Sequence, residues 1–315
     1  MRIALILALL APLAVAAQDY PTKPVRLVVG FPAGSSLDAA ARSINVKLSD
    51  ALKQPVIVDN RAGAGGNIGA EIVARARPDG YTILLGANGA LAVNPALYPK
   101  LPFDPVKDFS PVALVASVTN VLVLHPSAPA SSVEQLVKLA RAKTLNCGSG
   151  GVGTPGHLAL EVFNRMAGTK IVHVPYKGSG PALIDLMGGA IQLIFSTAAP
   201  ALPQIKAGKL KGIAVTTAKR SALLPELPTV AESGLKDFEV SGWYGLLAPA
   251  GTPRAIVERL NGETVRALQM EDVRQALFVQ GIEASPGGAE AFGRHLKSEI
   301  ARWGKLVREA GIRLE

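Results

Sequence analysis

Residues 148–160 read GSGGVGTPGHLAL, a glycine-rich turn that separates a short strand-like run from a helical pattern. Gly151, Gly153 and Gly156 have the spacing G-x-G-x-x-G, which in dinucleotide-binding proteins opens a helix directly after a strand. A strand, a tight turn and a helix in this order form half of a βαβ unit, the repeating element of α/β folds. The stretch therefore predicts an α/β protein, and it leaves open what the turn binds.

The glycine spacing alone does not make a dinucleotide site. Such a site also needs an acidic residue about 20 positions further on, where it binds a ribose hydroxyl. No Asp or Glu lies between Glu161 and Asp185, and Pro155 interrupts the turn. The other glycine-rich turn, at residues 63–69, is one residue too long for the motif. The sequence therefore predicts that the protein binds no NAD and no other cofactor.

Strand-like and helical patterns alternate along the rest of the chain. Short β-branched runs occur at residues 25–29, 56–60, 81–86, 144–149, 171–176, 191–196 and 210–217. Two longer apolar stretches, 110–126 and 238–249, break this alternation, and we expect them to cross between two lobes. Helical patterns at residues 253–268, 272–279 and 288–310 then return the tail to the first lobe.

This organisation predicts a two-lobed α/β clamshell. Each lobe is expected to hold a mixed, mostly parallel sheet flanked by helices, with the two crossing strands as a hinge. Lobes joined in this way close over a ligand. We expect residues 18–121 and 244–315 to form lobe 1 and residues 122–243 to form lobe 2.

The first 17 residues, MRIALILALLAPLAVAA, differ from the rest of the chain. One basic residue, Arg2, precedes an apolar run and the small residues Ala14, Val15 and Ala16, which is the order of a signal peptide. The run is too short for a membrane span, which takes roughly 20 apolar residues. We therefore expect residues 1–17 to direct export and the mature protein to be periplasmic.

Composition excludes several kinds of site. The net charge of +9 is dispersed, and aromatic residues make up only 5% of the chain, so a nucleic-acid groove is not expected. A diffuse positive field instead attracts small anions, and the alternative is that it only makes a soluble basic surface. Cys147 is the only cysteine, and its position near a strand end predicts a small buried residue. No pair of the four histidines has the spacing of metal ligands, so no metal is expected.

Four glycine-containing turns precede helical patterns, at residues 30–38, 63–71, 151–157 and 176–183. Free backbone N–H groups and the helix dipole make such helix starts suitable for anions. In parallel sheets these turns lie at the carboxyl edge, where ligand crevices form. The alternative is that the glycines only permit tight turns. Four such turns in two lobes favour a carboxylate site.

Long stretches of the chain resemble the Bug family, the extracytoplasmic solute receptors of tripartite tricarboxylate transporters. These stretches are residues 20–42, 59–86, 94–115, 173–189 (HVPYKGSGPALIDLMGG), 205–221, 224–234 (LPELPTVAESG) and 245–253 (GLLAPAGTP). The resemblance implies a two-lobed periplasmic binding protein of the type II-like, or Venus flytrap, kind, which binds a small carboxylate and is not an enzyme. It also implies a monomer that delivers its ligand to transporter membrane subunits or to a sensor protein.

The resemblance also implies a set of ligand-binding positions. In lobe 1 they are Phe31, Ala33, Gly34, Ser35, Ser36, Asp38, Ala64, Gly65, Asn88 and Gly89. In lobe 2 they are Thr154, His157, Gly178, Ser179, Gly180, Ser196 and Thr197. For two of these positions a structural role is the alternative, because Asp38 could cap its helix and His157 could brace its turn.

Two departures from the family pattern bear on the ligand. Leu37 stands where the family has a hydroxyl residue, and it either faces an apolar ligand body or packs in the core. Ser196 and Thr197 stand where the family often has an aspartate and a polar residue, which argues against a ligand with an ammonium group. The competing class is a secreted hydrolase that uses Ser149 and His157, although the G-x-S-x-G elbow of such enzymes is absent.

Overall fold

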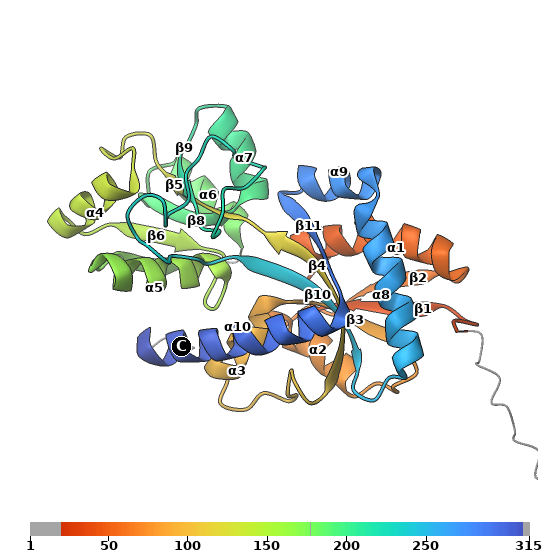
Figure 1. The fold of residues 1–315 in the computed structure, drawn as a ribbon. Coiled ribbons are helices and arrows are strands. Elements are labelled where there is room, and N and C mark those ends of the chain that lie inside the picture. The colour runs from red at the N-terminus through yellow and green to blue at the C-terminus, as the bar shows by residue number, and fades with distance from the viewer. Residues whose placement is uncertain (1–19, 177, 311–315) are drawn as a thin grey trace, which may run out of the picture.

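The computed structural model describes residues 20–176 and 178–310, which form two α/β lobes side by side (Figure 1). The first lobe is built on a six-stranded sheet with the order β11-β4-β10-β3-β1-β2. Its strands are β1 (Val25–Val29), β2 (Val56–Asn60), β3 (Thr82–Ala87), β4 (Phe109–Val118), β10 (Gly242–Pro249) and β11 (Ile282–Gly287). The expected signal peptide, residues 1–17, lies outside the described residues.

The second lobe is built on a five-stranded sheet with the order β7-β6-β8-β5-β9. Its strands are β5 (Asn120–Leu124), β6 (Asn146–Ser149), β7 (Val172–Pro175), β8 (Leu193–Thr197) and β9 (Lys211–Val215). Its helices are α4 (Val133–Ala142), α5 (Pro155–Ala167), α6 (Ser179–Met187) and α7 (Ala198–Lys206).

Helices cover the sheet of the first lobe on both faces. They are α1 (Ser36–Leu52), the short turns η1 (Ala64–Gly66) and η2 (Gly89–Val93), α2 (Asn67–Ala74), α3 (Asn94–Leu97), α8 (Arg254–Gln269), α9 (Glu271–Val279) and α10 (Ala289–Ala310). The helix α1 packs its apolar face, including Ala40, Ile44 and Leu48, into the core beside the fully buried Leu27 of β1. None of the described helices combines the length and hydropathy that a membrane span requires.

The predicted mixed α/β fold is confirmed, but the sheets are not mostly parallel. The strand β1 is parallel to β2 and β3, and β6 is parallel to β7 and β8. In contrast, β10 is antiparallel to β3 and β4, and β5 is antiparallel to β8 and β9. For β5 and β10 the reason is the hinge. The strands of the βα units run toward the cleft, whereas β5 and β10 carry the chain into each lobe from the hinge and run away from it.

The chain changes sheets at Thr119, between β4 and β5, and it returns to the first sheet at β10. Thr119 is fully buried, and its Oγ1 donates to Oε1 of Glu283 on β11 at 2.9 Å. Ser221, in the loop after β9, donates to the same carboxylate oxygen at 2.5 Å. The predicted lobe boundaries, after residues 121 and 243, remain a prediction.

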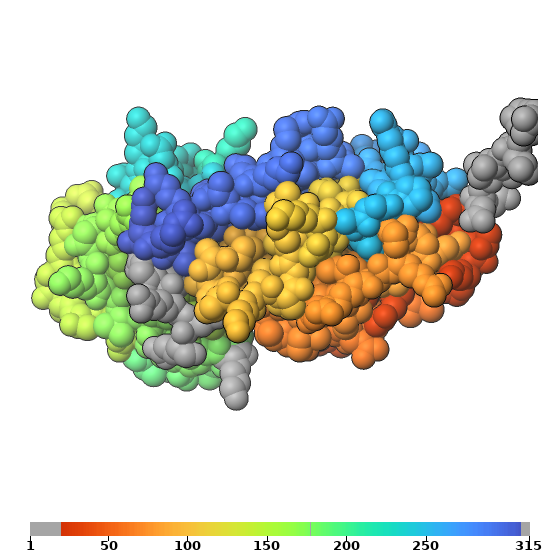
Figure 2. All heavy atoms as spheres, turned by 90° about the horizontal axis from the view of Figure 1, so that it is seen from below, coloured from red at the N-terminus to blue at the C-terminus, as the bar shows by residue number. Residues whose placement is uncertain are grey.

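The last helix connects the lobes a second time. From the first lobe, α10 extends until it contacts α5 of the second lobe (Figures 1 and 2). Arg165 on α5 forms an ion pair of 2.8 Å with Glu309 on α10. The fully buried Trp303 donates to Glu299 on the same helix at 2.9 Å. The tail therefore supports the hinge in addition to completing the first lobe.

Candidate functional site

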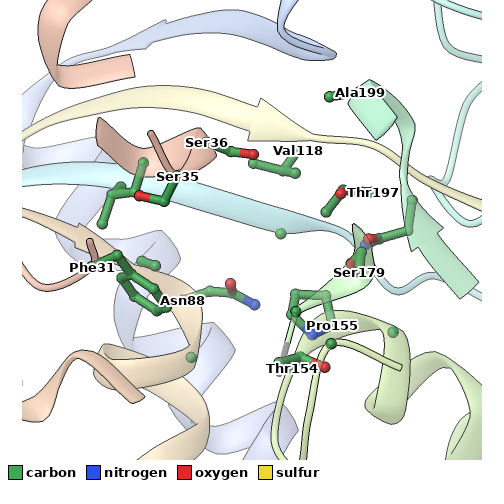
Figure 3. A pocket seen from close by; sticks show the side chains of 18 of the residues that line it. Phe31, Ser35, Ser36, Asn88, Val118, Thr154, Pro155, Ser179, Thr197 and Ala199 are labelled. Carbon is green, nitrogen blue, oxygen red and sulfur yellow. The ribbon is translucent and has the colours of Figure 1, made fainter. Parts of the chain in front are cut away.

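A cavity of about 730 Å³ lies between the lobes, and both of them line it (Figure 3). The first lobe contributes the turns after β1 and β3, and the second contributes the turns after β6, β7 and β8. Figure 3 shows Ser35, Ser36 and Asn88 on one side of the space and Thr154, Ser179 and Thr197 on the other. The carboxyl ends of parallel strands thus meet across the cleft, as α/β ligand sites require.

The turn after β1 is held in shape by Asp38. The Asp38 carboxylate accepts the Gly34 N–H at 2.9 Å and the Asn60 side-chain amide at 3.0 Å, and it pairs with Arg42. Burial opposes ionisation of Asp38, but the hydrogen bonds from Arg42, Gly34 and Asn60 hold the pKa of this carboxyl below its ordinary value. Ser35 caps α1 by accepting the Asp38 N–H at 3.2 Å. Asp38 therefore braces the turn from behind and does not line the cavity.

The turn after β6 is braced in a similar way by His157. Its Nδ1 accepts the Gly153 N–H at 3.1 Å, and its ring stacks on His173 at 4.0 Å. Burial, reinforced by His173, lowers the pKa of His157 to about 4. His157 is therefore a neutral acceptor beneath the turn. Thr154 fixes the other end of the turn by donating to the Gly151 carbonyl at 2.7 Å.

Four helices begin at the cavity. Their N-cap residues Ser35, Thr154, Gly178 and Thr197, which start α1, α5, α6 and α7, are all among the lining residues. No Asp, Glu, Lys, Arg or His is among the described residues that line the cavity. The electrostatic field there thus comes from helix N-termini and neutral donors, which favour an anion.

Two amide nitrogens in the cavity wall lack partners among the residues that the structure describes. Asn88 follows β3 and is 2% exposed, and Asn120 opens β5 and is 1% exposed. The Nδ2 atom of each has no hydrogen-bond partner among the described residues. Buried polar groups are otherwise nearly always paired in native proteins. Nearby, Asn94 satisfies this rule by donating to Asn67 at 2.7 Å.

Most of the predicted site residues line this cavity. They are Phe31, Gly34, Ser35, Ser36, Gly65, Asn88, Gly89, Thr154, Gly178, Ser179, Gly180 and Thr197. Five others do not: Ala33, Asp38, Ala64, His157 and Ser196. The two alanines are exposed outside it, and Ser196 is fully buried with its hydroxyl 3.0 Å from the Thr197 carbonyl. Leu37 both lines the cavity and packs in the core.

Sequence reasoning missed the lining residues that come from the hinge and the tail. Val118, Asn120, Gly242 and Tyr244 lie on or beside the crossing strands, and Val279 and Gln280 end α9. An asparagine at the start of the otherwise apolar run NVLVL was the available signal for Asn120. No local pattern pointed to Val279 or Gln280.

The Ser149–His157 pair of the hydrolase alternative does not form. Ser149 is fully buried, and its Oγ lies 2.6 Å from Nε2 of His173 and donates to the Gly151 carbonyl. Cys147 is buried as predicted, and burial raises the pKa of its thiol to about 12. In residues 20–176 and 178–310 no cluster of metal-ligating side chains occurs.

Comparisons with known proteins agree with this geometry. The model of the tripartite tricarboxylate transporter family receptor matches residues 40–312. The protein BugT of Bordetella pertussis is 38% identical, with 96% of this chain and 93% of BugT aligned. A Rhodopseudomonas palustris protein solved with adipate is 40% identical, with a TM-score of 0.84 over 94% of this chain and 100% of that one. The protein MatC of the same organism, solved with bound malate, is 33% identical, with a TM-score of 0.80 over 91% and 100%.

Proposed function

Because the chain belongs to the family of tripartite tricarboxylate transporter receptors, and is therefore a periplasmic solute-binding receptor, we propose that it captures a small organic carboxylate between its lobes. The observation that carries this proposal is the cavity in which four helices begin and no described charged side chain takes part. Such a site favours an anion and offers a cation no charged partner among the described residues.

The lining residues are divided between the two lobes, and this division explains how ligand binding favours closure. The turns of the first lobe, with Ser35, Ser36 and Gly65, offer donors in the open clamshell. Thr154, Ser179 and Thr197 of the second lobe reach the ligand only when the lobes approach each other. Contacts that exist only in the closed form are what allow a ligand to shift the equilibrium toward it.

The ligand that we propose lacks an ammonium group and has an apolar body. Leu37, Val118 and Val279 give the cavity apolar walls, and Thr197, which stands where the family often has a polar residue after an aspartate, provides a hydroxyl. The relatives solved with adipate and malate support an aliphatic acid. Aromatic acids such as nicotinate and terephthalate satisfy the same conditions and belong in the test.

The proposed role is capture and delivery without chemistry. The protein would act as a monomer, exported through residues 1–17, and the closed form would be recognised by transporter membrane subunits or by a sensor protein. Ser149 is fully buried and the Cys147 thiol is buried, so neither of these two nucleophiles lines the cavity. This supports a receptor without catalysis.

The first test is thermal unfolding of the protein without residues 1–17, against citrate, malate, adipate, glutamate, nicotinate and terephthalate, with NAD as a control. Ligand at about 100 times its Kd adds roughly 2.7 kcal/mol to the free energy of unfolding. That corresponds to a rise in melting temperature of about 2–4 °C per kcal/mol. We expect a rise with one class of acid and none with NAD or glutamate.

The combined variant Ser36→Ala and Thr154→Ala is the matched test of the site. Each change removes one hydroxyl from the cavity wall, so we expect weaker binding of the responding acid. The ligand-free melting temperature should fall modestly, because the Thr154 hydroxyl also donates to the Gly151 carbonyl. Unchanged affinity in this variant would show that the cavity was assigned to the wrong surface. A response to NAD alone would overturn the carboxylate proposal.

A further inference from the structure

The end of the second-lobe sheet that faces away from the cavity is a surface of its own. The cavity is lined by the turns after β6, β7 and β8, so the opposite end of the sheet holds the starts of these strands. The register places Leu124, the last residue of β5, beside Leu193 and Lys211, the first residues of β8 and β9. The helix α4, which leads into β6, lies at the end of this lobe away from the first lobe (Figures 1 and 2). The connections that meet here therefore lie on the far side of the lobe from the ligand cavity.

Positive charge gathers at this surface, which we call the basic end. Its five segments, which contain six cations and no Asp or Glu, are residues 125–132, 141–146, 167–172, 186–193 and 206–212. The cations are Arg141, Lys143, Lys170, Lys206, Lys209 and Lys211. Lys170 precedes one edge strand of the sheet, β7, and Lys211 begins the other, β9, so the charges span roughly 19 Å at about 4.8 Å per strand. Charges that are dispersed along the sequence are thus brought together by the order of the strands.

The cations of the basic end are not neutralised by one another's neighbours. Four of them are exposed and take part in no ion pair with a described residue: Lys143, Lys170, Lys206 and Lys209. The other two donate to backbone carbonyls, Arg141 to Ala167 at 2.6 Å and Lys211 to Ala128 at 2.9 Å. A carbonyl oxygen carries no net charge, so all six positive charges remain uncompensated.

The helices that adjoin the basic end do not supply the missing negative charge. Glu134 is the acid of α4, and it pairs with Lys138 of the same helix at 2.7 Å. Asp185 is the acid of α6, and it accepts from the Tyr176 hydroxyl at 2.7 Å. The helix α7 carries no acid. The field of the basic end is therefore directed outward, toward whatever lies beyond this end of the molecule.

The side chains at the basic end indicate the kind of partner. The five segments contain no aromatic residue, and among these described segments Val172 is the one large apolar side chain that is exposed. Protein interfaces depend on buried aromatic and arginine anchors, which this surface does not present. Exposed lysines on flexible stems instead attract anionic lipid headgroups without requiring a fixed geometry. The observations therefore favour a phospholipid surface over an acidic protein.

We propose that the basic end of the second lobe binds reversibly to anionic phospholipid headgroups at the membrane surface. Each lysine near such a surface adds a modest attraction, so the group holds the protein close to the membrane without anchoring it. The contact leaves the cavity, at the opposite end of the strands, free to open and close. This function goes beyond ligand capture and does not depend on the identity of the ligand, because it confines the receptor to the surface on which a membrane partner is found.

The experiment measures co-sedimentation of the protein without residues 1–17 with two kinds of vesicle, phosphatidylcholine alone and equimolar phosphatidylcholine and phosphatidylglycerol. The test variant combines one substitution in each of three connections of the basic end: Lys143→Gln, Lys170→Gln and Lys209→Gln. The matched control removes the same charge from three exposed lysines of the first lobe: Lys53→Gln, Lys100→Gln and Lys297→Gln. Thermal unfolding with the acid panel is measured on both variants.

We expect the wild type to sediment with the anionic vesicles and not with phosphatidylcholine alone. Binding should be lost at about 1 M salt, where the screening length is about 3 Å. One lysine near an anionic surface changes the partition about fivefold, so the test variant should bind about 100-fold more weakly. The control should lose less than about tenfold, because its lysines lie away from the contact. Both variants should keep the wild-type response to the acid panel, because none of the six lysines lines the cavity.

Three results would overturn the proposal while leaving the receptor function standing. The first is wild-type protein that does not bind anionic vesicles at low salt. The second is an equal loss of binding in the two triple variants, which would assign the attraction to net charge and not to the basic end. The third is soluble polyglutamate that binds the basic end more tightly than vesicles do at equal charge concentration, which would assign this surface to an acidic protein. A wild type that responds to no acid in the panel would instead overturn the proposed function and leave the membrane contact standing.

Discussion

At the scale of single residues, the site depends on side chains that do not line the ligand cavity. Asp38 and His157 each lie beneath a turn and accept a backbone N–H from it, that of Gly34 in one lobe and of Gly153 in the other. The turns must hold their remaining N–H groups in fixed directions, and such preorganisation is what makes a binding site effective. The family motifs contain residues that brace a turn as well as residues that line the cavity. Sequence alone could therefore not separate the bracing residues from the lining ones.

The neutral state of His157 predicts a loss of stability in acid. Its pKa of about 4 in the fold lies below the ordinary value of 6.5, so the unfolded chain takes up a proton first as pH falls. The free energy of unfolding is therefore unaffected above pH 6.5 and decreases between that pH and about 4, by on the order of 2–3 kcal/mol. Affinity should fall only as the pH approaches about 4, where His157 of the folded protein takes up a proton and its Nδ1 no longer accepts from Gly153.

The titratable groups near His157 determine which control this measurement needs. Its ring contacts His173, and Nε2 lies 3.7 Å from Glu161, whose pKa is raised by burial and whose protonation favours the fold as pH falls. The measurement is therefore the difference in urea unfolding between wild type and His157→Asn, which keeps an acceptor and removes the titration. Parallel pH profiles for the two proteins would contradict the assignment.

At the scale of elements, strands and helices followed from local patterns, whereas strand direction did not. The run VRLVV became the buried strand β1, whereas the N-cap of α1 is Ser35 and not Asp38, the residue that the sequence offered as a cap. The antiparallel β5 and β10 depend on which way the chain enters each lobe, a property of the whole topology. Val279 and Gln280 reach the cavity only because α9 returns to it, so no pattern within α9 could reveal them.

A substitution in the turn between α9 and β11 should affect how the two lobes close. Gly281 has a φ of 68°, and a Cβ atom there would meet the backbone N and Cα of Ala199 at the start of α7 in the other lobe. Gly281→Ala should therefore keep the lobes apart and weaken ligand binding by about tenfold, as the loss of roughly 1.4 kcal/mol from the closed form would do. Calorimetry measures the affinity, and small-angle scattering should show a larger radius.

Gly208→Ala is the matched control for this turn. Gly208 has the same φ of 68°, yet no atom outside its own neighbours lies within 4 Å of the added methyl group. The control bears the same backbone strain of about 1 kcal/mol without a clash between lobes. Equal losses of affinity in the two variants would mean that strain, and not separation of the lobes, explains the effect.

At the scale of the whole molecule, two of the interactions between the lobes should differ in strength. The Glu283 carboxylate accepts from both Thr119 and Ser221 at the hinge, in a site where Thr119 is fully buried. The pair Arg165–Glu309 joins exposed side chains of α5 and α10. A buried hydrogen bond to a charged group contributes about 1.5–3 kcal/mol, whereas an exposed ion pair contributes about 0–1 kcal/mol.

Ser221→Ala should therefore shift the molecule toward its open form and weaken ligand binding by about tenfold or more. Arg165→Ala should weaken binding by less than about fivefold, and by less still at high salt, because exposed charges are screened. Affinities measured by calorimetry at two salt concentrations check both expectations. A larger effect for Arg165→Ala than for Ser221→Ala would reverse the roles assigned to the two contacts.

The order of strands in the first sheet also has a consequence for how a newly made chain acquires this shape. The strand β10 lies between β3 and β4, yet it is encoded more than a hundred residues after either of them is complete. The strands of the second lobe, in contrast, all lie within residues 120–215. The chain is synthesised from its N-terminus, so β1, β2, β3 and β4 are complete before β10 exists. The strands β1, β2 and β3 therefore remain separate from β4 while the second lobe completes its sheet. During that interval the edges of β3 and β4 that later pair with β10 are unpaired. This is when the chain most needs protection from aggregation with other copies of itself.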